Sequence, residues 1–288
     1  MLFGAHVAIS GGISTAIERA EELGCDAVQV FTQSPRMWKP TVRAAEELEQ
    51  FRARREESRV RSVVCHALYL VNLASGDREI RKKSVTALRA SLETAAAIGA
   101  DGVMFHVGSH QGKGLVGALR RIVPPLRELL DLTTDDLWLL LENSAGAGGT
   151  IGRSVDELAV IAEKLDHHPR IGICLDSCHW WASGVDITDP DTLDAALADI
   201  ESRMGPGRVR CLHINDAAVG LGSNRDRHAS LGEGTIGDGM ATFLAHPAFQ
   251  DLPAILETRG PDGTYVGELA LLEELHRKGR RRRPKRWR

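Results

Sequence analysis

Hydrophobic and polar positions along the chain follow two alternating patterns, short apolar runs rich in β-branched residues and longer amphipathic segments. The apolar runs have the length and composition of buried strands. They lie at residues 2–9, 27–32, 62–67, 102–107, 137–143, 171–177, 208–215 and 254–258. The segments between them place apolar residues at helical spacing, for example at residues 17–24, 44–57, 85–99, 155–165, 193–205 and 268–279.

This alternation predicts the fold. Strands that alternate strictly with helices form a parallel sheet. Eight such units in a chain of 288 residues fit a closed (β/α)₈ barrel, the TIM barrel. The alternative is a doubly wound open sheet, which usually carries a glycine-rich phosphate loop after its first strand. The sequence GGIS at residues 11–14 is a weak match to such a loop. We therefore expect a single α/β barrel domain over residues 1–276.

Composition adds the expected compartment. No apolar run approaches the roughly 18 residues that a membrane span needs. The first residues, MLFGAHVAISGG, lack the basic and apolar regions of a signal peptide. We therefore expect a cytoplasmic protein that makes no membrane contact. The odd number of cysteines in a long chain argues against a disulfide framework. We expect reduced, buried thiols at Cys25, Cys65, Cys174, Cys178 and Cys211.

Charge is distributed unevenly along the chain. The formal net charge is −3, yet nine of the last twelve residues are Lys or Arg and none is acidic. Residues 1–276 therefore carry a formal −12. We expect residues 277–288 to form a disordered basic tail, because Pro284 and Trp287 supply neither a core face nor a helix. Such a tail suits an anionic partner such as nucleic acid, and the alternative is a solvated end without a role.

Candidate chemistry lies at the ends of the predicted strands. Active sites of these barrels are built where the strands end and from the loops that follow. Six consecutive predicted strands end in histidine or a carboxylate, and core packing does not explain such a series. All these residue types are ligands for zinc and similar divalent ions. The residues are His66, His106, Glu142, Asp176, His179, His213 and Glu257.

The carboxylates in this set favour bound cations. Glu142 follows three leucines, and an unpaired buried carboxylate is costly. Four carboxylates, Glu142, Asp176, Asp226 and Glu257, would meet at one mouth and repel one another. Divalent cations between them would remove both the burial penalty and the repulsion.

The loop at residues 223–237, SNRDRHASLGEGTIG, follows the seventh predicted strand. Asp226 and His228 are two residues apart, so an extended backbone directs both side chains to one side. Together with His179 they would form a three-residue site. The remaining ligands suffice for two further metals if Glu142 bridges them. Clustered metals of this kind are typical of phosphoester hydrolysis.

Several segments resemble endonuclease IV, the metal-dependent apurinic/apyrimidinic endonuclease family of DNA base-excision repair. The resemblance covers about residues 2–275. Its most specific segments are RIGICLDSCH (170–179), HIND (213–216), DRHASLGEGTIG (226–237) and ILET (255–258). The segments GAHVAISGG (4–12) and HALYLVNL (66–73) also match.

The resemblance implies a barrel with three zinc ions at its mouth. It implies that a hydroxide shared by two metals attacks the phosphate 5′ to an abasic sugar in double-stranded DNA. The products would be a 3′-hydroxyl and a 5′-deoxyribose phosphate. By the same resemblance, the first metal takes His66, His106 and Glu142, the second takes Glu142, Asp176, His213 and Glu257, and the third takes His179, Asp226 and His228.

The resemblance also implies residues that open the duplex. Arg36, Tyr69 and Leu70 match family positions that contact DNA. An aromatic and apolar wedge can replace lost base stacking while the abasic nucleotide turns out. From the residues alone, core packing at the start of a helix is the preferred explanation for Tyr69 and Leu70. We expect the protein to act as a monomer.

Two other functions compete. A metal-dependent sugar isomerase or epimerase uses the same barrel and ligand types, but with one or two metals. A non-catalytic DNA-binding protein would use the tail for binding and the metals for stability, although structural zinc sites are typically rich in cysteine. The ligand types also suit manganese or iron at some sites.

Overall fold

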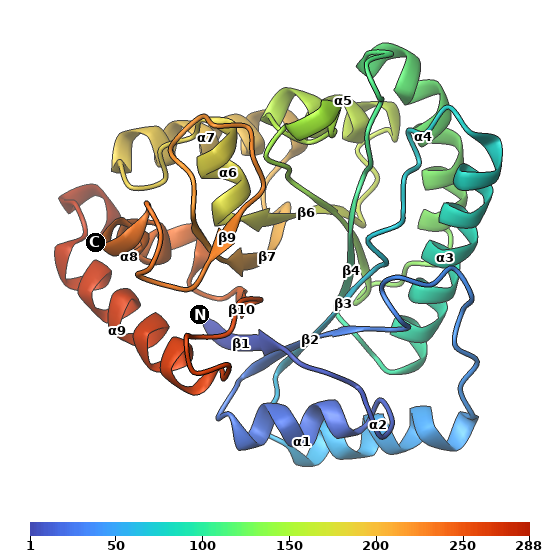
Figure 1. Ribbon diagram of the computed structural model, residues 1–288, viewed down its shortest axis with the longest axis horizontal. Helices are drawn as coiled ribbons and strands as arrows, with labels where there is room; N and C mark the ends of the chain where they lie inside the picture. Colours follow the sequence, from blue (N-terminus) through green and yellow to red (C-terminus); the bar gives the residue numbers. More distant parts are fainter.

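The computed structural model describes residues 1–288 and contains a closed barrel of eight parallel strands with helices around its outside (Figure 1). The predicted (β/α)₈ barrel is therefore confirmed. Around the barrel the strands follow the order β1, β10, β7, β6, β5, β4, β3, β2. Their bounds are β1 Leu2–His6, β2 Ala27–Phe31, β3 Ser62–His66, β4 Gly102–His106, β5 Trp138–Glu142, β6 Ile171–Asp176, β7 Val209–Ile214 and β10 Pro253–Leu256.

Helices follow the strands along the chain and pack on the outer surface of the barrel (Figure 1). They are α1 Thr15–Glu22, α2 Ala45–Glu57, α3 Arg78–Ala97, α4 Leu115–Leu130, α5 Val155–Lys164, α6 Ser177–Ser183, α7 Pro190–Met204, α8 Met240–Ala245 and α9 Val266–Arg282. Short 3₁₀ turns lie at Ala147–Gly149, Gly237–Gly239, Pro247–Phe249 and Lys285–Trp287. None of the helices combines the length and the apolar character that crossing a bilayer requires.

The hydrophobic core has two parts, as the barrel architecture requires. The larger cluster lies between the strands and the surrounding helices. The smaller one fills the barrel interior and consists of Ala27, Val64, Met104, Leu140, Cys174, Cys211 and Ile255. β1 contributes Gly4 at this level, where a Cβ atom would collide with the carbonyl of Ala27. The interior is thus closed by side chains below the mouth.

The loop after β7 is more ordered than its sequence suggests. The expected irregular segment 223–237 contains the two-residue strand β9, His228–Ala229. β9 pairs in antiparallel fashion with β8, Asp216–Ala217, directly after β7. The pairing holds the loop across the carboxyl end of the barrel, so His228 has a fixed position.

The C-terminal segment differs from the disordered tail that its composition predicts. α9 continues to Arg282, so the expected boundary after residue 276 falls inside this helix. Trp287 is 6% exposed, and its indole N–H donates to Asp194 Oδ1 at 2.7 Å. Arg286 forms ion pairs with Asp194 and Asp191 on α7. A buried aromatic anchor and acidic partners supplied by a distant helix explain the difference.

We predict that Gly279→Ala lowers the free energy of unfolding by about 2 kcal/mol, the usual scale for overpacking. A Cβ atom at Gly279 would collide with the carbonyl of Ala241, because α8 and α9 are in close contact there. Urea denaturation measures the effect. Gly267→Ala in the same helix is the control, since no atom lies within 4 Å of its added Cβ. Equal stability of the two variants would contradict the prediction.

Candidate metal centre

The carboxyl ends of the strands bring together the residues selected from the sequence. His66, His106, Glu142 and Asp176 are the last residues of β3, β4, β5 and β6. His213 is the penultimate residue of β7, and Glu257 directly follows β10. Because parallel strands all end at one rim, residues that are far apart in the chain meet there. The donor atoms form three groups, of which the first two share Glu142: His66, His106 and Glu142; Glu142, Asp176, His213 and Glu257; His179, Asp226 and His228.

Glu142 is the centre of the first two groups. Its side chain is 1% exposed. One oxygen, Oε2, lies 3.0 Å from His66 Nε2 and 3.5 Å from His106 Nδ1. The other, Oε1, lies 3.0 Å from His213 Nδ1. The two carboxylate oxygens therefore face different histidines, which is the geometry of a bridging ligand.

The second group extends from Glu142 to the neighbouring strands. His213 Nδ1 also lies 3.4 Å from Glu257 Oε2. Asp176 is fully buried and caps α6, where its Oδ1 accepts the backbone N–H of His179 at 2.7 Å. The same residue thus ends β6, begins α6 and faces the centre.

The third group is completed by two residues of the loop after β7, Asp226 and His228. His179 Nε2 and His228 Nε2 face each other at 3.3 Å. Asp226 contacts both, with Oδ2 at 3.3 Å from His179 and Oδ1 at 3.3 Å from His228. Asp226 is the most exposed of the proposed ligands, with a side chain 55% exposed. This group therefore lies at the solvent side of the centre.

The donors of the third group fit a small cation. A tetrahedral zinc ion has Zn–N distances of about 2.0–2.1 Å, which leaves neighbouring donors about 3.3 Å apart. The three contacts among His179, Asp226 and His228 each measure 3.3 Å. Two imidazole nitrogens and one carboxylate that converge at this separation are the donor types that a zinc-like ion takes. The residues present therefore fit a divalent metal.

Opposite charges compensate each other among the buried groups. Burial alone would raise the pKa of Glu142, yet the neighbouring histidines, His106 and His213 foremost, hold it well below its usual value. Burial alone would lower the pKa of His213, yet the carboxylates of Glu257 and Glu142 raise it well above its usual value. The pKa of Glu257 is lowered to about 2: burial raises it, but His213, His66 and His228 together lower it further. A proton on His213 balances these carboxylates, so metal binding there must release it.

Amide side chains hold the ligands in place, and the sequence analysis did not identify them. Gln29 Nε2 donates to Glu257 Oε1 at 2.9 Å, and its Oε1 lies 2.7 Å from His213 Nε2. Asn215 Nδ2 donates to Asp176 Oδ2 at 2.6 Å and to Glu257 Oε2 at 3.0 Å. Such partners fix the orientation of ligand side chains. Asn215 lies within the HIND segment, whereas Gln29 on β2 resembles an ordinary strand residue.

His6, at the end of β1, was also not among the candidate residues selected from the sequence. Its Nδ1 lies 2.9 Å from Gln29 Nε2. Burial lowers the pKa of His6 to about 4, so the ring is neutral and Nδ1 accepts this hydrogen bond. His6 is absent from the three donor groups, and it supports the centre through Gln29.

Asp216 anchors the loop that carries Asp226 and His228. Its carboxylate is fully buried and forms no ion pair. It is held instead by backbone N–H groups that converge on it, as in an anion-binding nest. The donors belong to Ala217, Gly232, Gly234, Ile236 and Gly237, at 2.8–3.3 Å. In the sequence, Asp216 is only the last residue of the HIND segment, and nothing local indicates this role.

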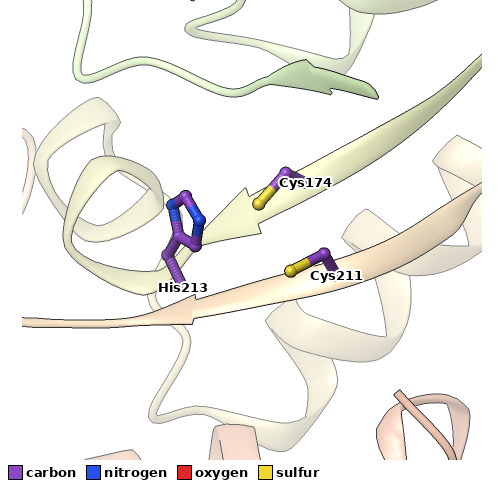
Figure 2. Close-up of side chains that lie close together, drawn as sticks. All are labelled: Cys174, Cys211 and His213. Carbon is purple, nitrogen blue, oxygen red and sulfur yellow. The ribbon is translucent and has the colours of Figure 1, made fainter. Parts of the chain in front are cut away.

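Two thiols lie below the centre. Cys174 and Cys211 are neighbours on β6 and β7, and their sulfur atoms lie close to the His213 ring (Figure 2). Both belong to the apolar cluster inside the barrel. Burial and the neighbouring Cys211 thiol raise the pKa of Cys174 well above its usual value, which disfavours the thiolate that binds metals. The expected reduced, buried cysteines are confirmed.

The candidate duplex-opening residues lie at the same mouth. Tyr69 is 56% exposed, and its ring meets those of Phe31 and His66 edge-on at 5.2 and 5.8 Å. Tyr69 and Leu70 line one cavity with His106, His179 and Asp226. Arg36 is exposed on the loop after β2. The exposure of Tyr69 argues against a simple core-packing role.

Comparison with known proteins finds relatives that match almost the whole chain. A family model described as the xylose isomerase-like TIM barrel matches residues 17–276. A Chloroflexus aggregans protein named probable endonuclease 4 is 39% identical over 281 residues, which cover 96% of this chain and 98% of that protein. A Methanoculleus marisnigri protein of the same name is 40% identical over 278 residues, covering 96% and 99%.

Solved structures give the same result. Endonuclease IV from Thermus thermophilus superposes with a TM-score of 0.84 at 35% identity, covering 98% of this chain and all of that one. A D-tagatose 3-epimerase-like protein superposes with a TM-score of 0.74 at 19% identity over 98% of this chain. The second similarity shows the barrel fold alone.

We predict that Asp216→Asn increases amide hydrogen exchange across residues 218–237. The side-chain NH₂ group of asparagine would face the backbone N–H donors that bind the Asp216 carboxylate in the wild type. The loss should be about 2 kcal/mol of local stability, the range for an unsatisfied buried group. Mass spectrometry of exchange measures it. Asp262→Asn is the control, since Asp262 accepts only from Thr264 in an exposed turn. Unchanged exchange in the loop of Asp216→Asn would contradict the anchoring role.

Proposed function

The chain belongs to the endonuclease IV family, and on this premise we propose that it is a DNA-repair hydrolase that acts at abasic sites. The proposed substrate is double-stranded DNA with an abasic site. The proposed reaction cleaves the phosphate 5′ to that site and leaves a 3′-hydroxyl and a 5′-deoxyribose phosphate. The observation that carries the proposal is the convergence of three donor groups, two of which share Glu142, at one mouth.

Three divalent ions, zinc in the first instance, would be held by these groups. When bound, such ions activate water and neutralise the charge that develops on a phosphate. The chain's own contribution is the placement of the donors. Glu142 faces His66 on one side and His213 on the other, so it would set the spacing of the first two ions.

The third group would serve a different part of the phosphate. His179, Asp226 and His228 lie on α6 and on the loop over the mouth, beside the cavity lined by Tyr69 and Leu70. An ion held there would lie on the solvent side of the Glu142 pair, where a departing sugar oxygen can be stabilised. Asp216 and the β8–β9 pair would keep this group in register with the others.

The cavity supports the choice of an abasic substrate. Tyr69 and Leu70 provide an aromatic and an apolar surface above the donor groups, and Arg36 adds a nearby positive charge. We propose that these residues fill the space left in the base stack when the abasic nucleotide turns toward the metals. A nucleotide without a base is the easiest to turn out, because it has lost its own stacking and pairing.

A sugar isomerase is less well supported. Such enzymes use one or two metals, which the groups around Glu142 would satisfy. The third group, with His179 and His228 converging on Asp226, would then have no role. Non-catalytic zinc sites are also a poor fit, since the donors are carboxylates and histidines at an open mouth and not a closed set of cysteines.

We predict that the purified wild-type protein holds about three divalent ions per chain and cleaves an abasic duplex, and that a chelator abolishes cleavage. Glu142→Gln should retain about one ion, because it damages two groups and leaves the third intact. Its cleavage rate should fall at least about 100-fold. Elemental analysis and single-turnover cleavage are the measurements.

The matched control is Glu268→Gln. Glu268 is also buried near the mouth, but it accepts the backbone N–H of Leu231 and lies outside the three donor groups. This variant should keep three ions and a normal rate. Three ions and a wild-type rate in Glu142→Gln would refute the bridging role.

We predict that replacing Tyr69 and Leu70 with alanine slows cleavage of an abasic duplex about tenfold or more. Base stacking on such side chains contributes about 1–3 kcal/mol. Cleavage of the same abasic site in a flexible single strand should change far less, since no stack has to be broken there. Rates on the two substrates are compared.

Val116→Ala provides the control for loss of an exposed apolar side chain, because Val116 is 75% exposed on α4. It should cleave both substrates at wild-type rates. If the Tyr69 and Leu70 variant lost the same factor on both substrates, these residues would act through packing alone.

A further inference from the structure

The exposed face of α9 carries a stripe of positive charge. Arg277 and Arg281 are four residues apart, as are Lys278 and Arg282, so all four side chains share one side of the helix. They line one surface hollow together with Glu274. No apolar residue contributes to this hollow. The composition of the stripe suits a polyanion and does not suit an apolar partner.

Most of this charge has no partner within the protein. Lys278 pairs with Asp238, whereas Arg277, Arg281 and Arg282 form no ion pair. Like charges four residues apart on a helix repel each other. An external array of negative charges would relieve that repulsion and complement the stripe.

The rest of the C-terminal segment holds the stripe rigidly. Arg283 donates through Nε to the carbonyl of Ala245 at 2.7 Å. Arg286 pairs with Asp194 at 2.6 Å, and Trp287 is buried beside the same aspartate. The basic residues thus divide into anchors and free cations. The free cations project from a fixed helix, so little ordering is needed when a partner binds.

The stripe lies away from the metal mouth. Tyr265, at the start of α9, donates to the carbonyl of His6 at the carboxyl end of β1. His276 lies instead against Phe3, near the amino end of that strand, with ring centres 5.3 Å apart. α9 therefore runs along the barrel from the mouth to the opposite end (Figure 1). At about 1.5 Å per residue, Arg281 lies roughly 24 Å along the helix from Tyr265.

We propose that the face formed by Arg277, Lys278, Arg281 and Arg282 is a second binding surface for the backbone of duplex DNA. It would hold a segment other than the one at the mouth. Duplex DNA has a persistence length of about 150 base pairs, so a segment lying across the mouth does not fold back along α9 unless it is bent sharply. Regularly spaced phosphates match regularly spaced arginines, and such contacts need no base sequence.

This inference rests on the proposed function only in its choice of DNA as the polyanion. The enzyme would bridge two duplex segments, one at the mouth and one on α9. The first 276 residues carry a formal −12, so this stripe supplies cationic surface that the body lacks overall. Bridging would let the protein pass between segments while it searches for rare lesions.

A bridging experiment tests the proposal. A duplex with an uncleavable abasic-site analogue is immobilised and loaded with the metal-bound full-length protein. A fluorescent undamaged duplex of about 25 base pairs is then added at increasing salt. The wild type should retain the fluorescent duplex. The Arg281→Gln/Arg282→Gln variant should retain at least tenfold less, and the slope of log binding constant against log salt should flatten by about two.

A matched variant removes the same charge elsewhere. Arg120→Gln/Lys164→Gln neutralises two exposed cations on α4 and α5, and it should bridge as the wild type does. Two results would overturn the proposal: an unchanged salt slope in the Arg281 and Arg282 variant, or equal losses in both double variants. Retention of an RNA duplex with no retention of DNA would overturn the choice of DNA.

Cleavage of a short abasic duplex is measured on the same preparations. If the wild type is held by the immobilised duplex but fails to cleave the short one, the proposed function fails, while retention of undamaged DNA still decides the role of α9. If the Arg281 and Arg282 variant loses cleavage together with bridging, the two surfaces are one and the second site is excluded.

Discussion

The rest of the site depends on the burial of a carboxylate, Glu142, among histidines. A buried charge is tolerated only when it is compensated, and here His66 and His213 approach its two oxygens from opposite sides. These three residues lie at the ends of different strands, so the barrel must close in a single register for the charges to balance. The site and the fold therefore constrain each other, and metal ions would take over the compensation that protonated histidines otherwise provide.

The side chains that hold the ligands of this centre in place bear no positive charge. Gln29 and Asn215 orient the ligands of the second group by hydrogen bonds. The loop is also anchored without a positive charge, because backbone N–H groups donate to the buried carboxylate of Asp216. The ligand positions at the mouth are thus free of lysine or arginine side chains that would compete with metal ions. The loop that carries Asp226 and His228 is thus held by many hydrogen bonds although it contains almost no regular structure.

The charge of the protein is organised along the length of the barrel. Carboxylates concentrate at the mouth, where divalent ions would balance them. Cations concentrate on the far part of α9, where no acidic residue of the chain forms an ion pair with Arg277, Arg281 or Arg282. Arg286 and Trp287 pack against Asp194, so the order of this segment comes from a few specific contacts with α7. Separation of the two regions keeps the basic stripe from neutralising the metal ligands.

The sequence by itself determined the barrel and most of its centre. Alternating strand and helix patterns fix a parallel barrel, and such a barrel brings residues like His66 and Glu142, at strand ends, to one rim whatever their separation in the chain. Tertiary structure alone decided the rest. The roles of Gln29 and Asp216, and the order of Trp287, depend on contacts across tens or hundreds of residues. Local sequence patterns do not predict such contacts, because these contacts form only when distant backbone segments reach their final positions.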